Sequence, residues 1–257
     1  MRTIFPVLFA TLAAALATRG LAATCEKASP RYTAAVIELY TSEGCSSCPP
    51  ADRWLSGVAG HGEEGVVPLG FHVDYWDYIG WKDEYGKAAY SERQHEVATW
   101  SKSRFVYTPQ VVLNGRDYRD WSGGIARDLS QLKGSPARAD LRIALDASGN
   151  GLAARVEATV PNPADRAGAA LYLALTQDNI VTPVKAGENS GVTLKHDHVV
   201  REWLGPIALD SNGKAVLART LSLPKGARLA DLGVSAVVQN HGSGDVLQAL
   251  ALPACKS

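Results

Sequence analysis

Two cysteines separated by two residues, Cys45 and Cys48, constrain the fold of this chain more than any other feature. The preceding residues 34–40 are apolar and rich in β-branched side chains, as in a buried strand. Residues 41–44 favour a turn. The two prolines after the second cysteine can open a helix, because the first helical turn needs no backbone N–H partner. The cysteine pair is therefore predicted to lie where a strand passes into a helix.

This placement favours redox chemistry at the pair. The positive end of a helix dipole stabilises a thiolate on Cys45, and a thiolate is the form that attacks a disulfide, provided that the sulfur is accessible. The two intervening serines allow Cys48 to fold back and resolve a mixed disulfide. Two alternatives stay open. One is half of a zinc site, although the chain has no second Cys-x-x-Cys, and the other is a static structural disulfide.

The first residues carry the pattern of a secretory signal peptide over residues 1–23. Arg2 supplies a positive start, residues 4–17 are uncharged and mostly apolar, and small residues surround a cleavage site near Ala22 or Ala23. The apolar run is shorter than the ~20 residues that span a bilayer. An uncleaved N-terminal anchor is the alternative. We therefore expect a periplasmic or secreted protein, in a compartment where disulfides persist.

The other two cysteines lie at the ends of the mature chain. Cys25 follows the expected cleavage site, and Cys255 is close to the last residue. Chain ends often lie near each other at the surface, and free thiols are a liability outside the cell. We therefore predict a structural disulfide between Cys25 and Cys255. Two mobile tails with free thiols are the alternative.

Charge and length restrict the function further. The 257 residues carry 26 Lys and Arg against 26 Asp and Glu, so no net field attracts nucleic acid or an anionic membrane. No segment after the signal peptide is apolar for long enough to cross a bilayer. The length of the mature chain suits one large domain or two small ones.

Residues 37–48 and 106–115, with a second strand and a helix between them, resemble a thioredoxin-like domain. In that fold a cis-proline lies beside the Cys-x-x-Cys pair, and Thr108-Pro109 matches its position. The resemblance implies that Pro109 shapes a groove in which Thr108 helps to bind an extended peptide. Over the whole mature chain, the sequence is similar to a bacterial family of secreted proteins that carries a domain-of-unknown-function label. Its hallmark stretches here are residues 43–52, 71–77 and 108–111.

Departures from thioredoxin prevent any transfer of its redox potential or direction of electron flow. Gly44 replaces a tryptophan, and Ser46-Ser47 replaces Gly-Pro. Thioredoxin also buries an acidic residue on the strand that leads into the motif, and Glu38 is a near match that lies one residue further from the cysteines. A Glu38 buried beneath Cys48 would relay protons during resolution. The alternative is a strand residue with polar neighbours.

Aromatic residues gather after the second expected strand. Tyr75 and Trp76 follow residues 66–73, at the carboxyl end of a strand, which is where α/β folds place ligands. We expect them to form a wall beside Cys45 that accepts a peptide substrate. The alternative is an aromatic core beneath a long connection.

Three histidines are weak candidates for a metal site. Together, Cys45, Cys48 and His72 are similar to the donor set of thioredoxin-like copper-delivery proteins, but those proteins usually space their cysteines by three residues. His196 and His198 are alternate residues, which share one face in a strand. A structural role is nevertheless the better expectation for a lone histidine. We predict no metal site and no cofactor.

After residue 132 the sequence changes character. Residues 133–136 form a linker, beyond which short alternating apolar runs are separated by turn residues, as in a β-sandwich. The polar stretch 193–205 either packs against the first domain or forms a partner-binding surface. We expect strands over 140–146, 152–160, 169–176, 215–223, 234–239 and 246–249. The predicted fold class is an α/β thioredoxin-like domain, residues 24–134, followed by a β-sandwich-like domain, residues 138–257.

Together these features predict an exported thiol–disulfide oxidoreductase or isomerase that acts on protein thiols and disulfides. In that enzyme Cys45 attacks and Cys48 resolves. Two alternatives belong to other classes: a non-catalytic binding module that keeps only the scaffold, and a periplasmic copper carrier. The substrate, the direction of electron flow and the oligomeric state are not predicted by the sequence.

Overall fold

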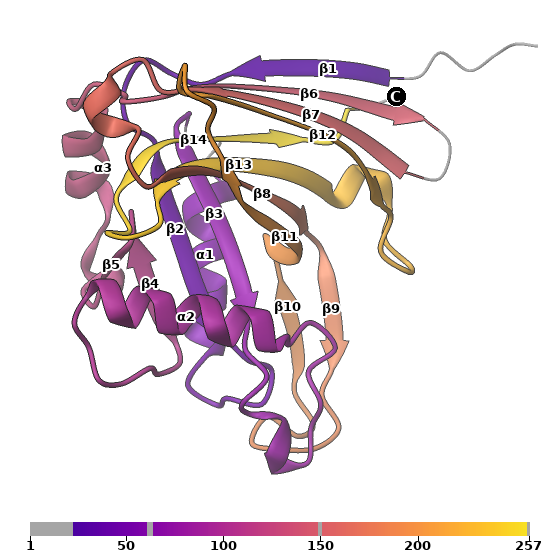
Figure 1. Ribbon diagram of the computed structural model, residues 1–257. Helices are drawn as coiled ribbons and strands as arrows, with labels where there is room; N and C mark the ends of the chain where they lie inside the picture. Colours follow the sequence, from indigo (N-terminus) through magenta and orange to yellow (C-terminus); the bar gives the residue numbers. More distant parts are fainter. Residues whose placement is uncertain (1–22, 61–63, 149–150, 256–257) are drawn as a thin grey trace, which may run out of the picture.

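The computed structural model describes residues 23–60, 64–148 and 151–255. The expected signal peptide lies outside these residues apart from Ala23. The described chain forms three α-helices and fourteen β-strands (Figure 1). The helices are α1 (Pro49–Gly60), α2 (Ala88–Trp100) and α3 (Ala126–Lys133).

An eight-stranded sheet runs through the molecule in the order β14-β13-β8-β11-β3-β2-β4-β5. Its strands from the first half of the chain are β2 (Ala35–Thr41), β3 (Val66–His72), β4 (Gln110–Leu113) and β5 (Arg116–Asp117). Those from the second half are β8 (Ala169–Gln177), β11 (Val199–Ala208), β13 (Leu232–Asn240) and β14 (Val246–Pro253). The two halves meet where β3 pairs with β11 and the Gly70 N–H donates to the His198 carbonyl at 2.8 Å.

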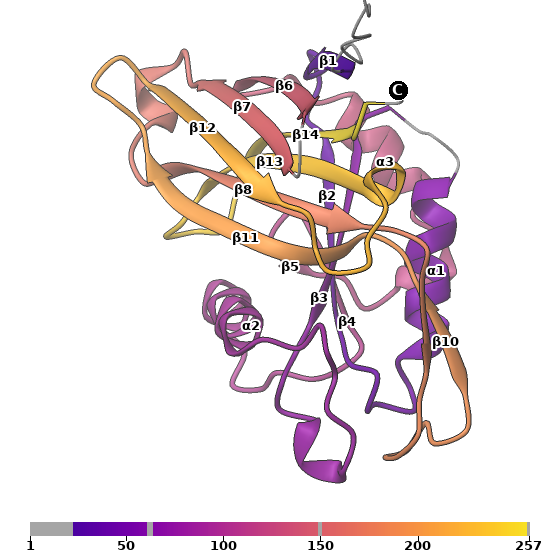
Figure 2. The same cartoon turned by 90° about the vertical axis from the view of Figure 1, so that its right-hand side faces the viewer.

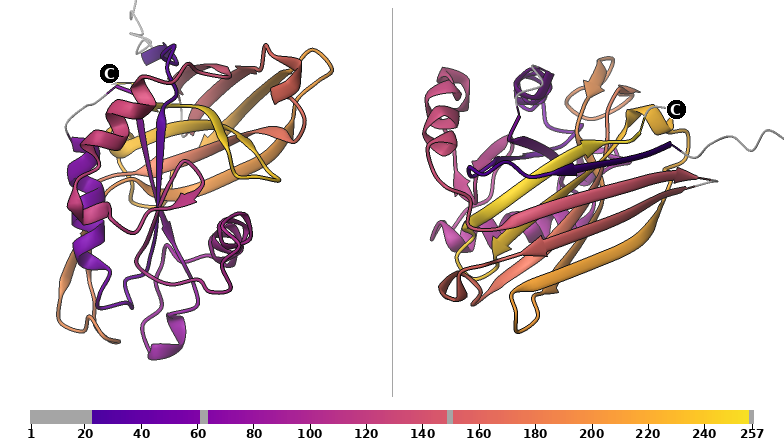
Figure 3. Two further views of the ribbon diagram at one scale, coloured as in Figure 1. Left: turned by 90° about the vertical axis from the view of Figure 1, so that its left-hand side faces the viewer. Right: turned by 90° about the horizontal axis from the view of Figure 1, so that it is seen from above.

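A second sheet has four strands in the order β1-β6-β7-β12. These strands are β1 (Ala23–Ala28), β6 (Asp140–Ser148), β7 (Gly151–Thr159) and β12 (Lys214–Ser222). The sheet packs against β8, β13 and β14 of the large sheet (Figures 1 and 3). Burial of each large aliphatic side chain contributes roughly 1.5–3 kcal/mol. The fully buried ones between the sheets include Ile143, Leu145, Leu152, Leu171 and Leu173.

The three helices cover both faces of the other end of the large sheet (Figure 3). Successive side chains of a strand point to opposite faces, and every residue of β2 is buried. On one face, Ile37 packs with Leu55 of α1 and Leu129 of α3. On the other, Tyr40 belongs to the core that includes Tyr90 of α2. The strand that leads into the cysteine motif is therefore fixed from both sides.

A separate antiparallel hairpin is formed by β9 (Ile180–Pro183) and β10 (Thr193–His196). It belongs to neither large sheet and extends alongside α1, toward the end of the molecule where β2 and β3 finish (Figures 1 and 2). β10 contacts α1. Part of the polar stretch 193–205 thus packs against the first half of the chain.

The predicted fold class is wrong. Strands predominate over helices in the described chain, and β2 to β5 share one sheet with four strands of the second half. An α/β thioredoxin-like domain followed by a separate β-sandwich-like domain does not account for this sheet. Sequence patterns report which stretches are extended, but not which distant strands pair, so the joining of β3 to β11 was missed. The two predicted domains, residues 24–134 and 138–257, remain a prediction about which parts of the chain fold independently.

Cys25 and Cys255 form a disulfide with a Cα–Cα distance of 5.6 Å across a sequence separation of 230 residues. Cys25 lies on β1 at the edge of the small sheet, and Cys255 follows β14 at the edge of the large sheet. The bond therefore ties the two sheets together at their edges. In the described ranges, no helix is both long and apolar enough to span a membrane.

Candidate functional site

The cysteine pair lies at the predicted junction of strand and helix. β2 ends at Thr41 and leads into a turn in which the Cys45 N–H donates to the Ser42 carbonyl at 3.1 Å. α1 begins at Pro49, directly after Cys48. Both cysteines therefore lie at the positive end of the α1 dipole.

The two cysteines are joined to each other by a disulfide. The exposed fraction is 1% for Cys45 and 0% for Cys48, whereas Ser46 and Ser47 between them are exposed. The accessible sulfur that attack requires is thus absent from this state. The Ser47 hydroxyl lies 3.3 Å from the Cys45 sulfur, a distance at which it can donate a hydrogen bond to a thiolate formed there on reduction.

The loop after β3 connects the cysteine motif to the proline strand. A Cβ added to Gly44 would lie 3.2 Å from the Cβ of Trp76, so the two residues are in close contact. The Trp76 indole N–H donates to the Thr108 hydroxyl at 2.8 Å, and the Thr108–Pro109 peptide bond is cis. The structure therefore gathers the cysteine motif, Trp76, Thr108 and Pro109 around one end of the large sheet.

Tyr75 is a neighbour of this group and is partly buried. Its hydroxyl donates to Gln94 of α2 at 3.1 Å, and the Gln94 amide donates in turn to the Tyr107 carbonyl at 2.8 Å. Burial raises the pKa of Tyr75, so its hydroxyl stays protonated at neutral pH. Tyr75 thus supports the backbone before the cis-proline.

The contacts of the Glu38 side chain are made with Arg93 of α2 and with Tyr40. Arg93 of α2 binds its carboxylate through Nε at 3.2 Å and Nη2 at 2.9 Å. The Tyr40 hydroxyl donates to the same carboxylate at 2.6 Å. Burial, followed by the charge of Glu38, raises the pKa of Tyr40. Because a guanidinium keeps its charge, this carboxylate has a permanent cationic partner on the α2 face, and a proton relay to Cys48 has no support here.

A buried histidine–carboxylate cluster lies between α1 and the hairpin; its members are Glu43, Asp52, His72, Asp83 and His196. Asp83 lies 2.7 Å from His72 Nδ1 and accepts from the Glu43 N–H at 2.9 Å. Burial alone would lower the pKa of His72, but the carboxylates around it, Asp83 foremost, raise that pKa. Burial alone would raise the pKa of Asp83, but His72 holds it below its usual value. Both shifts favour the charged forms of the two residues, which lie in direct contact in the interior.

His196 reaches this cluster from the second half of the chain. Its Nε2 is 3.4 Å from Glu43 Oε1, and its Nδ1 is 4.0 Å from Asp52 Oδ2. Within the described residues, Glu43 Oε1 has no hydrogen-bond partner. The same is true of both ring nitrogens of His196. Burial raises the pKa of Asp52. Sequence reasoning singled out His72 and His196 but missed the three carboxylates, because only the fold reveals that they meet.

The predicted histidine pair does not form. The chain turns between β10 and β11, where His198 has a positive φ of 59°, so His198 and His196 do not share a strand face. His198 Nδ1 lies 3.2 Å from Asp178 instead. Over the ranges that the structure covers, no three His, Cys, Asp or Glu side chains converge as metal ligands. The copper-carrier alternative therefore gains no support from the site.

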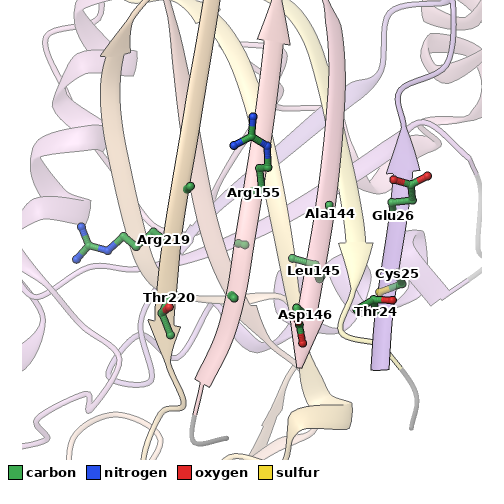
Figure 4. Close-up of a pocket in the computed structure, with 12 residues that line it drawn as sticks. Thr24, Cys25, Glu26, Ala144, Leu145, Asp146, Arg155, Arg219 and Thr220 are labelled. Carbon is green, nitrogen blue, oxygen red and sulfur yellow. The ribbon is translucent and has the colours of Figure 1, made fainter. Parts of the chain in front are cut away.

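A hollow of about 660 Å³ lies on the four-stranded sheet (Figure 4). Arg155 on β7 and Arg219 on β12 line it, with Glu26 on β1. Its remaining lining mixes alanine with polar residues and Leu145, and the only cysteine in it, Cys25, is part of the terminal disulfide. No residue of the Cys-Ser-Ser-Cys motif or of the histidine–carboxylate cluster lines this hollow. The cysteine pair remains the candidate site on chemical grounds.

The β9–β10 loop, residues 184–192, binds the cysteine motif. The Glu188 carboxylate accepts from the Ser46 N–H at 3.0 Å and from the Ser46 hydroxyl at 2.7 Å. The Asn189 amide donates to the carbonyls of Glu43 at 2.8 Å and Cys45 at 3.0 Å. No local sequence signal predicts these contacts, because the partners are more than 140 residues apart.

Two solved structures are similar to this chain. The crystal structure of an Agrobacterium tumefaciens protein, a structural genomics target, is 26% identical over 89% of this chain and 98% of that chain, with a TM-score of 0.66. HBP35 of Porphyromonas gingivalis is 15% identical over 88% of this chain and 76% of that chain, with a TM-score of 0.65, and at this identity the likeness shows the fold alone. A search of curated proteins found no match.

A family model covers most of the chain. It matches residues 36–239, which include the cysteine motif, the cis-proline and the β9–β10 loop. The chain therefore belongs to the family described as protein of unknown function, DUF1223.

Proposed function

We propose that this protein is an exported thiol–disulfide oxidoreductase or isomerase that acts on protein thiols and disulfides through Cys45 and Cys48. The observation that carries the proposal is the position of their disulfide, at the amino end of α1 and near the loop that holds Thr108 and cis-Pro109. A bond between residues only three apart closes a very short loop, so it restricts the unfolded chain far less than the terminal disulfide does. A chemical role accounts for such a bond better than a structural one.

The exchange takes two steps and moves two electrons. In the oxidising direction, a substrate thiolate attacks the Cys45 sulfur, the Cys45–Cys48 bond breaks, and Cys48 leaves as a thiolate. A second substrate thiolate attacks the substrate sulfur of the mixed disulfide, and Cys45 leaves as a thiolate. The substrate loses two electrons and two thiol protons, and the cysteine pair gains two electrons and takes up two protons. The reducing direction is the reverse, with Cys45 as the attacking thiolate.

The surroundings of Cys45 supply two sources of thiolate stabilisation. The first is the dipole of α1, whose positive end lies at the motif. The second is the Ser47 hydroxyl, 3.3 Å from the sulfur. Pro49 and Pro50 carry no N–H, so the first helical turn offers fewer backbone donors than usual. The Ser47 hydroxyl therefore contributes more to stabilising the Cys45 thiolate than it would if the two residues after Cys48 carried backbone N–H groups.

The disulfides support the proposed location in the periplasm or outside the cell. Both bonds of the structure, one at the chain ends and one in the motif, belong to the class that persists in oxidising compartments. The signal peptide expected over residues 1–23 is in agreement with export. The partners that we propose for the pair are polypeptides with exposed thiols or disulfides.

A non-catalytic binding module is the second candidate. The observation that favours it is the burial of both sulfurs, since a bond with a 1% exposed Cys45 cannot be reached by a bulky thiol. In that case the disulfide would serve only to hold the turn before α1. The two candidates differ in whether the bond exchanges with a substrate.

Reduction of insulin by dithiothreitol distinguishes the candidates. We expect the wild-type protein to accelerate the reaction and Cys45→Ser to return it to the uncatalysed rate, because the thiol that remains, Cys48, is fully buried. Cys48→Ser retains the attacking sulfur, so after reduction and removal of dithiothreitol it should accumulate a mixed disulfide with insulin that a mass shift reveals. A wild-type rate equal to that of buffer, with no trapped adduct in Cys48→Ser, would favour the binding module.

A further inference from the structure

The β9–β10 loop keeps its shape through its own hydrogen bonds. The Val184 N–H donates to the Val192 carbonyl, and the Gly191 N–H donates to the Val184 carbonyl, both at 2.9 Å. The Ser190 hydroxyl donates to a carbonyl of the same loop at 3.2 Å. These bonds lie within the loop and do not involve the cysteine motif. The tip of the loop around Glu188 and Asn189 can therefore leave the motif while β10 stays packed against α1.

Two adjacent side chains attach this loop to the motif. Glu188 is exposed and accepts two hydrogen bonds from Ser46, which lower its pKa and keep it ionised at neutral pH. Asn189 is 5% exposed and uses its amide nitrogen for the carbonyls of Glu43 and Cys45. Four hydrogen bonds thus connect an element of the second half to the turn that carries the disulfide.

These four hydrogen bonds use the polar groups that a polypeptide substrate needs. The N–H and hydroxyl of Ser46 are donors suited to a substrate carbonyl, and the carbonyls of Glu43 and Cys45 are acceptors suited to a substrate N–H. An extended polypeptide presents C=O and N–H groups in alternation along its length. It can therefore replace the side chains of Glu188 and Asn189 by groups of the same hydrogen-bonding type.

We propose that the β9–β10 loop is an internal stand-in for substrate, which closes the Cys45–Cys48 disulfide until an extended polypeptide displaces Glu188 and Asn189. The inference rests on the proposed function and adds two things to it. The substrate class is unfolded polypeptide, and access to the disulfide is controlled by competition between that substrate and the loop. It accounts for a reactive pair that is buried while its two intervening serines are exposed.

Apolar side chains near the loop suit such a partner. Val192 ends the loop and is 45% exposed, and Tyr78 in the loop after β3 is 82% exposed. The β9–β10 loop touches that second loop, because a Cβ added to Gly187 would lie 3.2 Å from the side chains of Ile79 and Trp81. Unfolded polypeptides expose apolar segments that folded proteins bury, so these side chains favour an unfolded partner.

The rate at which dithiothreitol reduces the Cys45–Cys48 bond tests the loop directly. We expect Glu188→Ala/Asn189→Ala to be reduced about tenfold faster than wild type or more, because the net contribution of the hydrogen bonds is lost. Ser190→Ala is the matched control, since its hydroxyl bonds only within the loop, and its rate should stay within about twofold of wild type. Alkylation of the new thiols and peptide mass analysis give the rate for each bond separately.

The terminal disulfide serves as the internal control in the same samples. Its reduction rate must not change in the double variant, because unfolding would expose both bonds. Glu188→Gln, which keeps the size of the side chain but loses its charge, should give an intermediate rate and keeps the inference testable if the double variant does not fold. Equal rates for wild type and either folded variant would overturn the inference.

S-carboxymethylated lactalbumin, an unfolded polypeptide without thiols, tests the substrate class. We expect it to accelerate reduction of the wild-type Cys45–Cys48 bond to a plateau, without a further effect on Glu188→Ala/Asn189→Ala. Absence of any effect on the wild type would overturn the substrate class. Insulin turnover is a separate measurement. If the double variant is reduced fast but the protein does not turn over insulin, the proposed function is rejected and the loop remains a cover for the disulfide. If the protein turns over insulin but wild type and the double variant are reduced at equal rates, the loop is not a cover.

Discussion

Replacement of both Cys25 and Cys255 by serine should lower the free energy of unfolding by about 5 kcal/mol, because their disulfide spans 230 residues and restricts the unfolded chain. The bond also joins the edge strand β1 of the small sheet to the end of β14, the edge strand of the large sheet. Loss of this bond therefore removes the covalent link between the edge strands of the two sheets. Urea denaturation followed by far-ultraviolet circular dichroism measures the change.

The pair Cys45→Ser/Cys48→Ser is the matched control for this prediction. Its disulfide spans a separation of three residues, so the chain-entropy model assigns it about 2 kcal/mol or less. We expect the two double variants to differ clearly in their urea midpoints. Equal urea midpoints for the two double variants would contradict the assignment of a structural role to Cys25–Cys255 and a chemical role to Cys45–Cys48.

Arg93→Met should lower the free energy of unfolding by about 3–5 kcal/mol, because it leaves the buried Glu38 carboxylate without its cation. Arg93 is 3% exposed, binds Glu38 at 2.9 Å and donates to Gln239 of β13 at 2.7 Å. Its guanidinium also lies 5.0 Å from the ring centre of Trp100. The side chain thus connects α2 with strands from both halves of the large sheet.

A surface arginine provides the control for Arg93. Arg119 pairs with Asp117 at 2.8 Å but is 79% exposed, so Arg119→Met should change the free energy of unfolding far less than Arg93→Met. Replacing both partners, Glu38→Leu with Arg93→Met, should recover part of the loss because no charge remains buried alone. A loss for Arg93→Met as small as that for Arg119→Met would show that the buried pair does not support the sheet.

Local features of the chain were predictable from the sequence. The cysteine motif lies between a strand and a helix because apolar β-branched residues precede it and prolines follow it. Asn114 and Gly115 form the tight turn between β4 and β5, with φ values of 46° and 78°. A Cβ on Gly115 would lie 2.0 Å from the Gly244 carbonyl, so this turn also needs glycine for contact with the second half.

The joined sheet was not predictable from local patterns, although one strand carried a signal. Residues 169–176 are apolar without alternation, and eight consecutive residues of β8 are buried. Such a run is typical of a strand covered on both faces, as at the centre of a large sheet. The alternating runs around it favoured a sandwich instead, in which one face of each strand is exposed. Recognising the run would have favoured a larger sheet than two separate domains allow.

The candidate site was predictable in its cysteines, Trp76 and the cis-proline loop, but not in its contacts with the second half of the chain. The role of Glu38 was predicted from its resemblance to the buried acidic residue of thioredoxin, but the pleat of β2 directs its side chain toward Arg93. Asn189 and His196 reach the site from a hairpin that no pattern connects to the motif. Contacts between residues so far apart depend on strand pairing across the molecule, and a single sequence does not encode that pairing in a local signal.

The redox equilibrium of the Cys45–Cys48 bond in the folded protein tests the central claim most directly. The protein is incubated in glutathione buffers of graded potential, and thiols are trapped by alkylation and counted by mass for each cysteine. We predict that Cys45 and Cys48 become reduced while Cys25–Cys255 stays oxidised and the circular dichroism stays native, as expected of an exchangeable bond beside a structural one. Reduction of both bonds together, and only where the native signal is lost, would contradict the claim.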